Sequence, residues 1–125
     1  MQREKGKRGE RELAAKLSGL TGLDIKRNLG AEREGGDDIS IQGWSIECKL
    51  HKVLALSAWW KQAVEQASDG LAPALMWREH GKSQWWVQCR LDELTGRGGQ
   101  LADVPVRLTI EDWVKVLSGR VNFIN

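Results

Sequence analysis

Residues 35–50 read GGDDISIQGWSIECKL and place four ionisable side chains in a stretch whose alternation predicts a short β-hairpin. The four residues are Asp37, Asp38, Glu47 and Lys49. Strands disfavour aspartate, and charged side chains rarely lie in a half-buried sheet unless another group compensates their charge. Carboxylates grouped in this way could bind a divalent cation, and the neighbouring lysine could act on a phosphate or a water molecule.

The period-2 geometry of a strand puts Glu47 and Lys49 on one face of residues 44–50. The strand that starts at Asp38 returns across the turn at 42–43, so Asp38 can lie beside Glu47. Two carboxylates at one point repel each other unless a proton or a cation intervenes, and oxygen ligands favour Mg²⁺ or Mn²⁺. We therefore expect a metal site here, with Lys49 orienting or deprotonating the attacking water or stabilising charge on a phosphate.

The hairpin residues also have a purely structural interpretation. A D…ExK pattern arises by chance in many charged sequences, and Glu47 and Lys49 on an exposed strand face would simply be solvated. Of the two aspartates, Asp38 is the preferred ligand, because Asp37 could belong to the preceding loop as an Asx turn.

A further carboxylate, Glu10, comes from a predicted amphipathic helix over residues 4–20. At about 100° per residue, Glu10 falls inside the apolar stripe of this helix, whereas Glu12 points to solvent. A carboxylate on the core side of a helix needs a partner, because an unpaired buried charge is costly. The metal site is one such partner, and Arg27 is the structural alternative.

The remaining pattern predicts an α/β fold, a mixed sheet flanked by helices in the order α-β-β-β-α-β-β-α, with residues 104–108 as an additional candidate strand. Ser57 is expected to cap the second helix, and Thr109 the last one. Trp60 falls on the buried stripe of the second helix. Trp59 lies off it, where it could contact a second subunit, stack on an exposed base or be partly buried. The expected helices cover 4–20, 57–68 and 109–117, and the expected strands 24–29, 39–41, 44–50, 73–78 and 83–90.

Length and composition favour one domain spanning residues 1–125, with a net charge of +2. Residues 1–34 hold nine Lys and Arg against six Asp and Glu, and a basic arm over about 1–9 could lie along phosphates or be a solvated terminus.

The sequence has no apolar run near the roughly 20 residues of a membrane span, and no secretory signal. Cys48 and Cys89 lack zinc-ligand spacing, so we expect reduced thiols in a cytoplasmic protein. Neither a glycine-rich nucleotide loop nor a hydrolase triad is present.

Four motifs, KGKRGERELAAKL, KRN, GGDDIS and SIECK, occur in this order within residues 5–90. Together they resemble the archaeal and bacteriophage Holliday junction resolvases of the PD-(D/E)XK nuclease superfamily. The resemblance implies a restriction-endonuclease-like fold and a homodimer that cuts branched DNA in the presence of Mg²⁺, for which Mn²⁺ can substitute, leaving 5′-phosphate and 3′-hydroxyl ends. Only eight residues separate Asp38 from Glu47, a shorter hairpin than in the archaeal proteins.

The resemblance also implies roles for individual residues. The metal ligands would be Asp38, Glu47, the Cys48 carbonyl and the helix carboxylate Glu10, with Lys49 as the catalytic lysine. Arg11 and Arg27 would match basic residues that face phosphate. Apart from the resemblance, Lys5, Lys7 and Arg8 of the basic arm could contact DNA. Gln62, one turn before Gln66, could hydrogen-bond the DNA backbone or belong to an ordinary polar helix face. Two alternatives stay open: a related nuclease acting on flaps, nicks or duplex DNA, and a non-catalytic DNA-binding module with the same fold.

Overall fold

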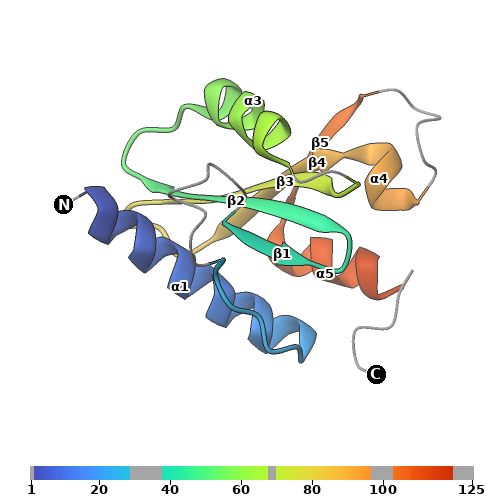
Figure 1. Ribbon diagram of the computed structural model, residues 1–125, viewed down its shortest axis with the longest axis horizontal. Coiled ribbons are helices and arrows are strands. Elements are labelled where there is room, and N and C mark those ends of the chain that lie inside the picture. Colours follow the sequence, from blue (N-terminus) through green and yellow to red (C-terminus); the bar gives the residue numbers. More distant parts are fainter. Residues whose placement is uncertain (1, 29–37, 68–69, 97–102, 120–125) are drawn as a thin grey trace.

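The chain forms a five-stranded mixed sheet with helices on both faces (Figure 1). This computed structural model describes residues 2–28, 38–67, 70–96 and 103–119. The strands are β1 (Ile39–Ile41), β2 (Trp44–His51), β3 (Ala72–Glu79), β4 (Trp85–Arg90) and β5 (Pro105–Thr109). The helices are α1 (Gln2–Thr21), α3 (Leu56–Gln66), α4 (Leu91–Thr95) and α5 (Ile110–Ser118).

The strands follow one another across the sheet in the order β1-β2-β3-β4-β5. Only β2 and β3 run parallel, and the other three pairs are antiparallel. A parallel pair needs a crossover connection, which α3 provides. Because of the parallel pairing, the ends of β2 and β3 meet at one end of the sheet, where His51 lies opposite Glu79.

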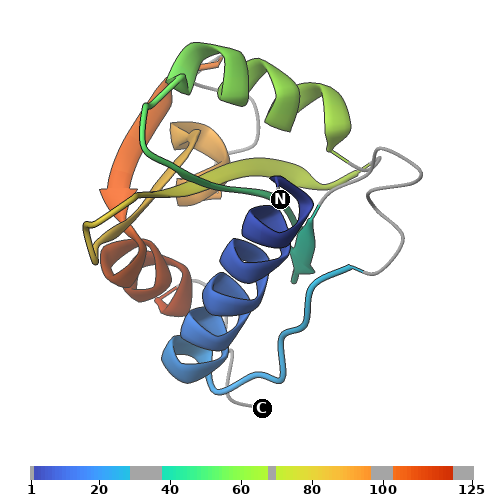
Figure 2. The ribbon, with the colours of Figure 1, turned by 90° about the vertical axis from the view of Figure 1, so that its left-hand side faces the viewer.

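The main core lies between the sheet and helices α1 and α5, which pack beneath it in Figure 2. Leu13 and Leu17 of α1 and Trp113 of α5 are fully buried there, and the Trp113 ring meets Trp44 edge-on at 5.2 Å between centroids. A smaller cluster of Trp59, Ala63, Leu75 and Trp77 joins α3 to the opposite face of the sheet.

On α3, the burial of two neighbouring tryptophan side chains is the reverse of the predicted one. Trp59 is buried with Ala63, one turn further along, whereas Trp60 is half-buried and lies beside Arg90. Because both rings are apolar, the sequence pattern allowed either face of the helix to be the buried one. In the structure, the face that carries Trp59 packs against β3. Ser57 is not the N-cap either: the helix begins at Leu56, after Ala55, and has no side-chain cap.

Residues 24–28 do not form the predicted strand, and Leu29 lies outside the described residues. The Ser18 hydroxyl of α1 accepts a hydrogen bond from the Ile25 N–H and donates one to the Ile25 carbonyl, so Ile25 is paired with a helix. The Asn28 N–H donates to the Asp38 carbonyl at 2.7 Å. This segment therefore crosses from α1 to the start of β1 as irregular chain.

The other predicted elements are present, with small shifts of their ends, and two regions differ. Thr109 caps α5 as predicted, accepting a hydrogen bond from the Asp112 N–H. The short helix α4 was not anticipated. The helix α1 begins at Gln2, two residues before the predicted start, so the basic residues predicted as an arm lie in its first turns. In the described part of the chain, no helix has the length and apolar character needed to cross a membrane.

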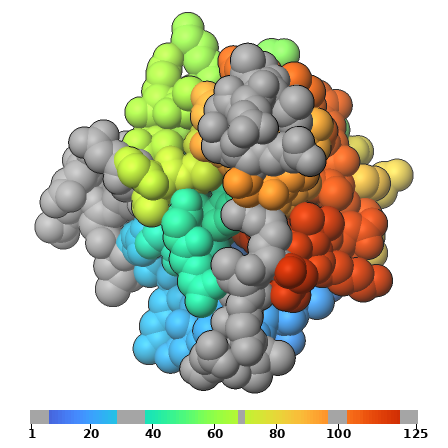
Figure 3. Space-filling view, turned by 90° about the vertical axis from the view of Figure 1, so that its right-hand side faces the viewer, coloured from blue at the N-terminus to red at the C-terminus, as the bar shows by residue number. Residues whose placement is uncertain are grey.

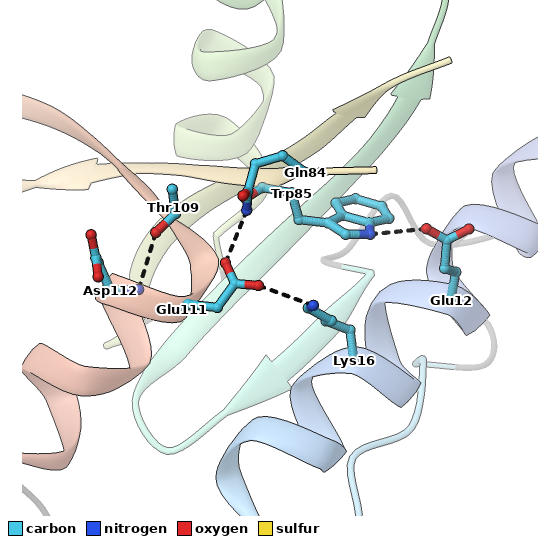
Figure 4. Close-up of polar contacts among 7 residues, drawn as sticks. All are labelled: Glu12, Lys16, Gln84, Trp85, Thr109, Glu111 and Asp112. Atoms are coloured by element: carbon cyan, nitrogen blue, oxygen red, sulfur yellow. Dashed lines mark hydrogen bonds and ion pairs between the residues drawn. The ribbon is translucent and has the colours of Figure 1, made fainter. Parts of the chain in front are cut away.

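The Glu12 side chain is 40% exposed, yet it is not simply solvated as predicted, because it ties α1 to the sheet (Figure 4). Its carboxylate accepts hydrogen bonds from Arg78 Nε and Nη2, at 2.7 and 2.9 Å, and from Trp85 Nε1 at 2.9 Å. One turn further along α1, Lys16 forms an ion pair with Glu111 of α5 at 3.0 Å. These contacts fix the rotation of α1 about its axis.

Gly9 allows α1 to lie close to β2. A Cβ atom at this position would lie 3.1 Å from Leu50 Cβ and 3.8 Å from Cys48 Sγ. The Leu50 Cβ is fixed to the backbone of β2 and cannot move aside without moving the strand. The missing side chain therefore sets the distance between α1 and the edge of the sheet.

We predict that Gly9→Ala and Gly19→Ala change stability in opposite directions. Gly19 is in the same helix with open space around it, so alanine there should stabilise the protein by about 0.5–1 kcal/mol. At Gly9, overpacking costing about 1–3 kcal/mol should outweigh that gain and lower the free energy of unfolding. Urea denaturation of the three proteins measures both effects, and equal stabilisation by the two substitutions would contradict the close approach.

We predict that Glu12→Gln destabilises the protein by about 1–3 kcal/mol, because it removes the charged acceptor of Arg78, whose side chain is only 18% exposed although that of Glu12 is 40% exposed. The matched control is Lys16→Met, which breaks an ion pair whose two side chains are 40% and 37% exposed. Its effect should stay below about 1 kcal/mol. Urea denaturation again gives both values; a larger loss in the Lys16 variant would show that α1 is held chiefly through α5.

Candidate active site

A hollow of about 600 Å³ opens near the first turns of α1 and the ends of β2 and β3. It is lined by all four residues predicted as catalytic: Glu10, Asp38, Glu47 and Lys49. They come from α1, from the residue before β1, and from β2. The structure therefore brings the sequence-predicted site together in one place, except for Asp37, which lies outside the described residues.

The edge of β2 carries the site, because β1 is short. The strand β1 pairs only with residues 44–46 of β2, so the next residues of β2 lie beyond its end. Asp38 occupies this position: its Oδ2 accepts a hydrogen bond from the Cys48 N–H at 2.8 Å. In a strand the N–H and C=O of one residue point to the same side, so the Cys48 carbonyl also points toward this edge.

Glu47 and Lys49 share one face of β2, as the alternation predicted, and lie opposite Leu75 and Trp77 of β3. The Glu47 side chain is only 6% exposed, and its Oε2 lies 3.6 Å from Lys49 Nζ. Its other oxygen, Oε1, is buried and has no hydrogen-bond partner among the described residues. Glu47 is therefore not a solvated surface residue, and one of its oxygens is available to a ligand.

The site holds more negative charge than its surroundings stabilise. Burial raises the pKa of Asp38 to about 8, and the nearby carboxylates of Glu47 and Glu10 add to the rise despite the Cys48 N–H bond and Lys49. Burial also raises the pKa of Glu47 above its usual value, and Lys49 opposes that shift. Without a cation, the two carboxyl groups favour holding a proton near neutral pH.

Glu10 faces the hollow but has the structural partner that was the alternative to a metal. Its Oε1 lies 3.4 Å from Arg27 Nη1, and both side chains are about four-fifths buried, with 19% and 20% exposed. Within the described ranges, no group of three or more His, Cys, Asp or Glu side chains is placed to hold a metal ion. Glu10 as a metal ligand therefore stays a prediction.

The remaining donors at the edge of β2 do fit a hard cation. Asp38 and Glu47 offer carboxylate oxygens, and the carbonyl of Cys48 offers a third oxygen beside them. Mg²⁺ commonly takes one or two carboxylates and completes its shell with water and substrate phosphate, so three acidic side chains are not required. The Cys48 thiol does not belong to this set, because burial and the nearby carboxylates raise its pKa and keep it protonated.

The basic residues predicted to contact DNA are only partly brought together. Arg11 and Arg27 line the same shallow hollow on the outer side of α1. Lys7 is half-buried and Arg8 exposed in the first turns of this helix, whereas the Lys5 side chain lies outside the described atoms. Gln62 does not line the site; its amide donates to Gln66 Oε1 at 3.4 Å on α3.

The hollow is also lined by four residues that the sequence did not assign to the site: His51, Lys52, Val53 and His80. The His80 N–H donates to the His51 carbonyl at 2.8 Å, which places the two histidines side by side. Their proximity follows from the parallel pairing of β2 and β3, which residue spacing did not reveal.

Comparison with protein-family models, with curated proteins and with solved structures gave no match to this chain.

We predict that the metal-free protein loses stability as the pH rises between about 4 and about 8. In this range an unfolded Asp38 would ionise, near its usual pKa of 3.8, whereas the folded protein holds the proton up to about pH 8. Ionisation therefore favours the unfolded chain, and the loss levels off above that range. Thermal unfolding in EDTA across the range measures the effect.

Asp38→Asn is the control for this pH dependence, since the amide cannot ionise. Its thermal stability should fall less between about pH 4 and 8 than that of the wild type, and Mg²⁺ should raise the melting temperature of the wild type most at the alkaline end. Parallel pH profiles of the two proteins would contradict the assignment of the proton to Asp38.

Proposed function

We propose that this chain is a Mg²⁺-dependent, structure-specific endodeoxyribonuclease, a Holliday junction resolvase of the PD-(D/E)XK type. The observation that supports this most is the meeting of Asp38, Glu47 and Lys49 in one hollow, where Glu47 is buried, Asp38 is half-buried and the pKa values of both carboxyl groups are raised. Perturbed carboxylates in a cleft are typical of functional sites. The proposed fold is the restriction-endonuclease-like variant of the mixed sheet.

Each residue of the site has a role in this proposal. Asp38, Glu47 and the Cys48 carbonyl would hold the ion. When bound, Mg²⁺ would neutralise the carboxylates and polarise an oxygen of the scissile phosphate. Lys49 lies within reach of Glu47 and would orient the attacking water or stabilise negative charge on the phosphate. The water oxygen bonds to phosphorus, the bond to the 3′ oxygen breaks, and the 3′ oxygen receives a proton.

The basic residues on α1 would hold the DNA backbone. Arg8 and Arg11 are exposed on this helix, and Arg11 shares a hollow with Arg27. Contacts to phosphate position a protein on DNA without reading its sequence, which suits an enzyme that recognises the shape of a branch. A homodimer would present two such sites, as paired nicks across a four-way junction require.

One observation favours a second candidate, a DNA-binding module without catalysis. Among the described residues that line the hollow, the ion pair between Glu10 and Arg27 leaves two acidic side chains, Asp38 and Glu47, for a metal. In a module that has lost catalysis, the same basic surface would bind DNA, and the carboxyl groups would stay protonated. Metal-independent binding without any cleavage would favour this candidate.

We predict that the wild-type protein cuts a labelled four-way DNA junction in Mg²⁺, leaving 5′-phosphate ends, and that Glu47→Gln lowers the rate by about 10²-fold or more. The amide keeps the size of the side chain but removes the negative charge that would hold the ion. Glu65→Gln, an exposed residue of α3, is the matched control and should cut like the wild type. Product length and end chemistry are read by gel electrophoresis.

The choice of substrate separates the junction-resolving enzyme from related nucleases. Four unlabelled DNAs, namely a junction, a flap, a nicked duplex and an intact duplex, are each added in competition with the labelled junction. The extent to which each one inhibits cleavage of the labelled junction ranks the substrates. Equal cleavage by the wild type and by Glu47→Gln, or no cleavage in either Mg²⁺ or Mn²⁺, would overturn the enzymatic proposal.

A further inference from the structure

A second hollow, of about 480 Å³, lies next to the candidate active site on the α3 face of the sheet. We call it the indole groove; the residues that matter here are Leu54, Leu56, Trp77, Lys82, Trp86 and Arg107. The helix α3 packs on β2 and β3, and the groove lies where β4 and β5 continue beyond that cover. It is not needed for the chemistry described above.

Trp86 forms the accessible part of this groove. It lies directly opposite Trp77 across the β3–β4 ladder, so the two indoles share a face of the sheet. Trp77 is 4% exposed and belongs to the core under α3, whereas Trp86 is 40% exposed. A large ring left open to solvent beside an otherwise buried one provides a flat apolar surface on which another ring can stack.

The groove is lined by two cationic side chains and one acidic one, Glu79, so its charge is positive on balance. Arg107 of β5 is exposed, and its Nε donates to Gln88 Oε1 at 2.7 Å, which holds the guanidinium on the same face as Trp86. Lys82, in the turn between β3 and β4, adds a second exposed positive charge. An aromatic surface bordered by positive charges is the combination that binds single-stranded nucleic acid, with a base on the ring and phosphates on the cations.

The indole groove and the active-site hollow share two walls. In the segment that leads from β2 to α3, Val53 lines the active-site hollow and Leu54 the groove. At the end of β3, Glu79 lines the groove and His80 the active-site hollow. Adjacent residues are about 3.8 Å apart at Cα, so a nucleic-acid strand leaving one hollow could enter the other directly.

We propose that the indole groove binds an unpaired base of the DNA substrate, stacked on Trp86, within a few nucleotides of the bond that is cut. This inference rests on the proposed nuclease function and specifies its substrate as DNA with unpaired nucleotides beside the cleavage site. The alternative occupant, a second copy of the chain, fits less well. A stable interface buries roughly 800 Å² per partner, whereas this groove offers a few partly exposed apolar side chains with cations at its rim.

Binding can be measured without cleavage, in EDTA, by fluorescence anisotropy of two labelled DNAs. One is a duplex interrupted by a central unpaired thymine tract, and the other is a fully paired duplex of the same length. We predict that Trp86→Leu weakens binding of the interrupted duplex by about 5- to 150-fold. Binding of the paired duplex should change less than about twofold, because only the stacking surface is lost.

Two further variants test whether stacking is responsible. Trp86→Phe keeps an aromatic ring and should restore most of the lost affinity, whereas leucine keeps apolar surface without a ring. Trp60→Leu removes another partly exposed indole, which lies beside Arg90 outside the groove, and should bind both DNAs like the wild type. Thermal unfolding shows whether each variant is folded.

Three results would overturn the inference. They are unchanged binding of the interrupted duplex in Trp86→Leu, binding in Trp86→Phe that is as weak as in Trp86→Leu, and equal weakening for both DNAs accompanied by a change from dimer to monomer in sedimentation. The last result would identify the groove as a contact between copies. Failure of the nuclease proposal gives a different result. If the protein binds the interrupted duplex through Trp86 but never cuts DNA in Mg²⁺, the base-binding role of the groove is supported and the nuclease function is refuted.

Discussion

The placement of a buried and a half-buried acidic side chain, Glu47 and Asp38, at one point on the edge of β2 is the constraint on which the rest of the structure depends. Asp38 and Glu47 repel each other when ionised, and desolvation adds to the penalty, which is why their pKa values rise. A single lysine, Lys49, does not balance them. A sheet edge built only for stability would more readily hold apolar or solvated residues here, so the placement favours a functional interpretation.

The surrounding fold creates this edge and holds it open. The strand β1 has only three residues, so β2 extends past it, and Asp38 rather than a strand satisfies the Cys48 N–H. On the other face, Gly9 lets α1 come within contact of Leu50. The adjacent Glu10 is thereby brought to the same hollow from the opposite side of the sheet. The contacts of Glu12 with Arg78 and Trp85 keep α1 from rotating away.

The sequence pattern correctly predicted the features that depend on residues close together in the chain. The alternation in residues 44–50 placed Glu47 and Lys49 on one face, the turn at 42–43 brought Asp38 back to them, and TIED predicted the Thr109 cap. Position on the helical wheel placed Glu10 on the inward side of α1 but could not choose between a metal and Arg27.

The errors of the sequence-based prediction arise where distant segments meet. Glu12 lies opposite the apolar stripe when α1 is considered alone, yet it is bound by residues more than sixty positions away in β3 and β4. Trp59 and Trp60 offered equivalent apolar stripes, and only packing on β3 distinguished them. The short helix α4 and the histidines beside the active-site hollow likewise depend on the sheet, whose order no local period reveals.

The parallel pairing of β2 with β3 links the two hollows to one another. Because these strands run in the same direction, the chain leaves both of them at the same end of the sheet, as Figures 1 and 2 show. The opposite end, formed by the β1–β2 turn, the start of β3 and α4 (Figure 3), lies a full strand length away. An antiparallel pair would have sent one of the exits to that far end. The segment after β2 and the turn after β3 thus form a common wall, with the carboxyl groups on one side and the exposed indole on the other. The proposed nuclease would have to recognise both a phosphate to cut and a distortion in the adjacent strand. It would need these two surfaces at neighbouring positions, and this sheet order provides them.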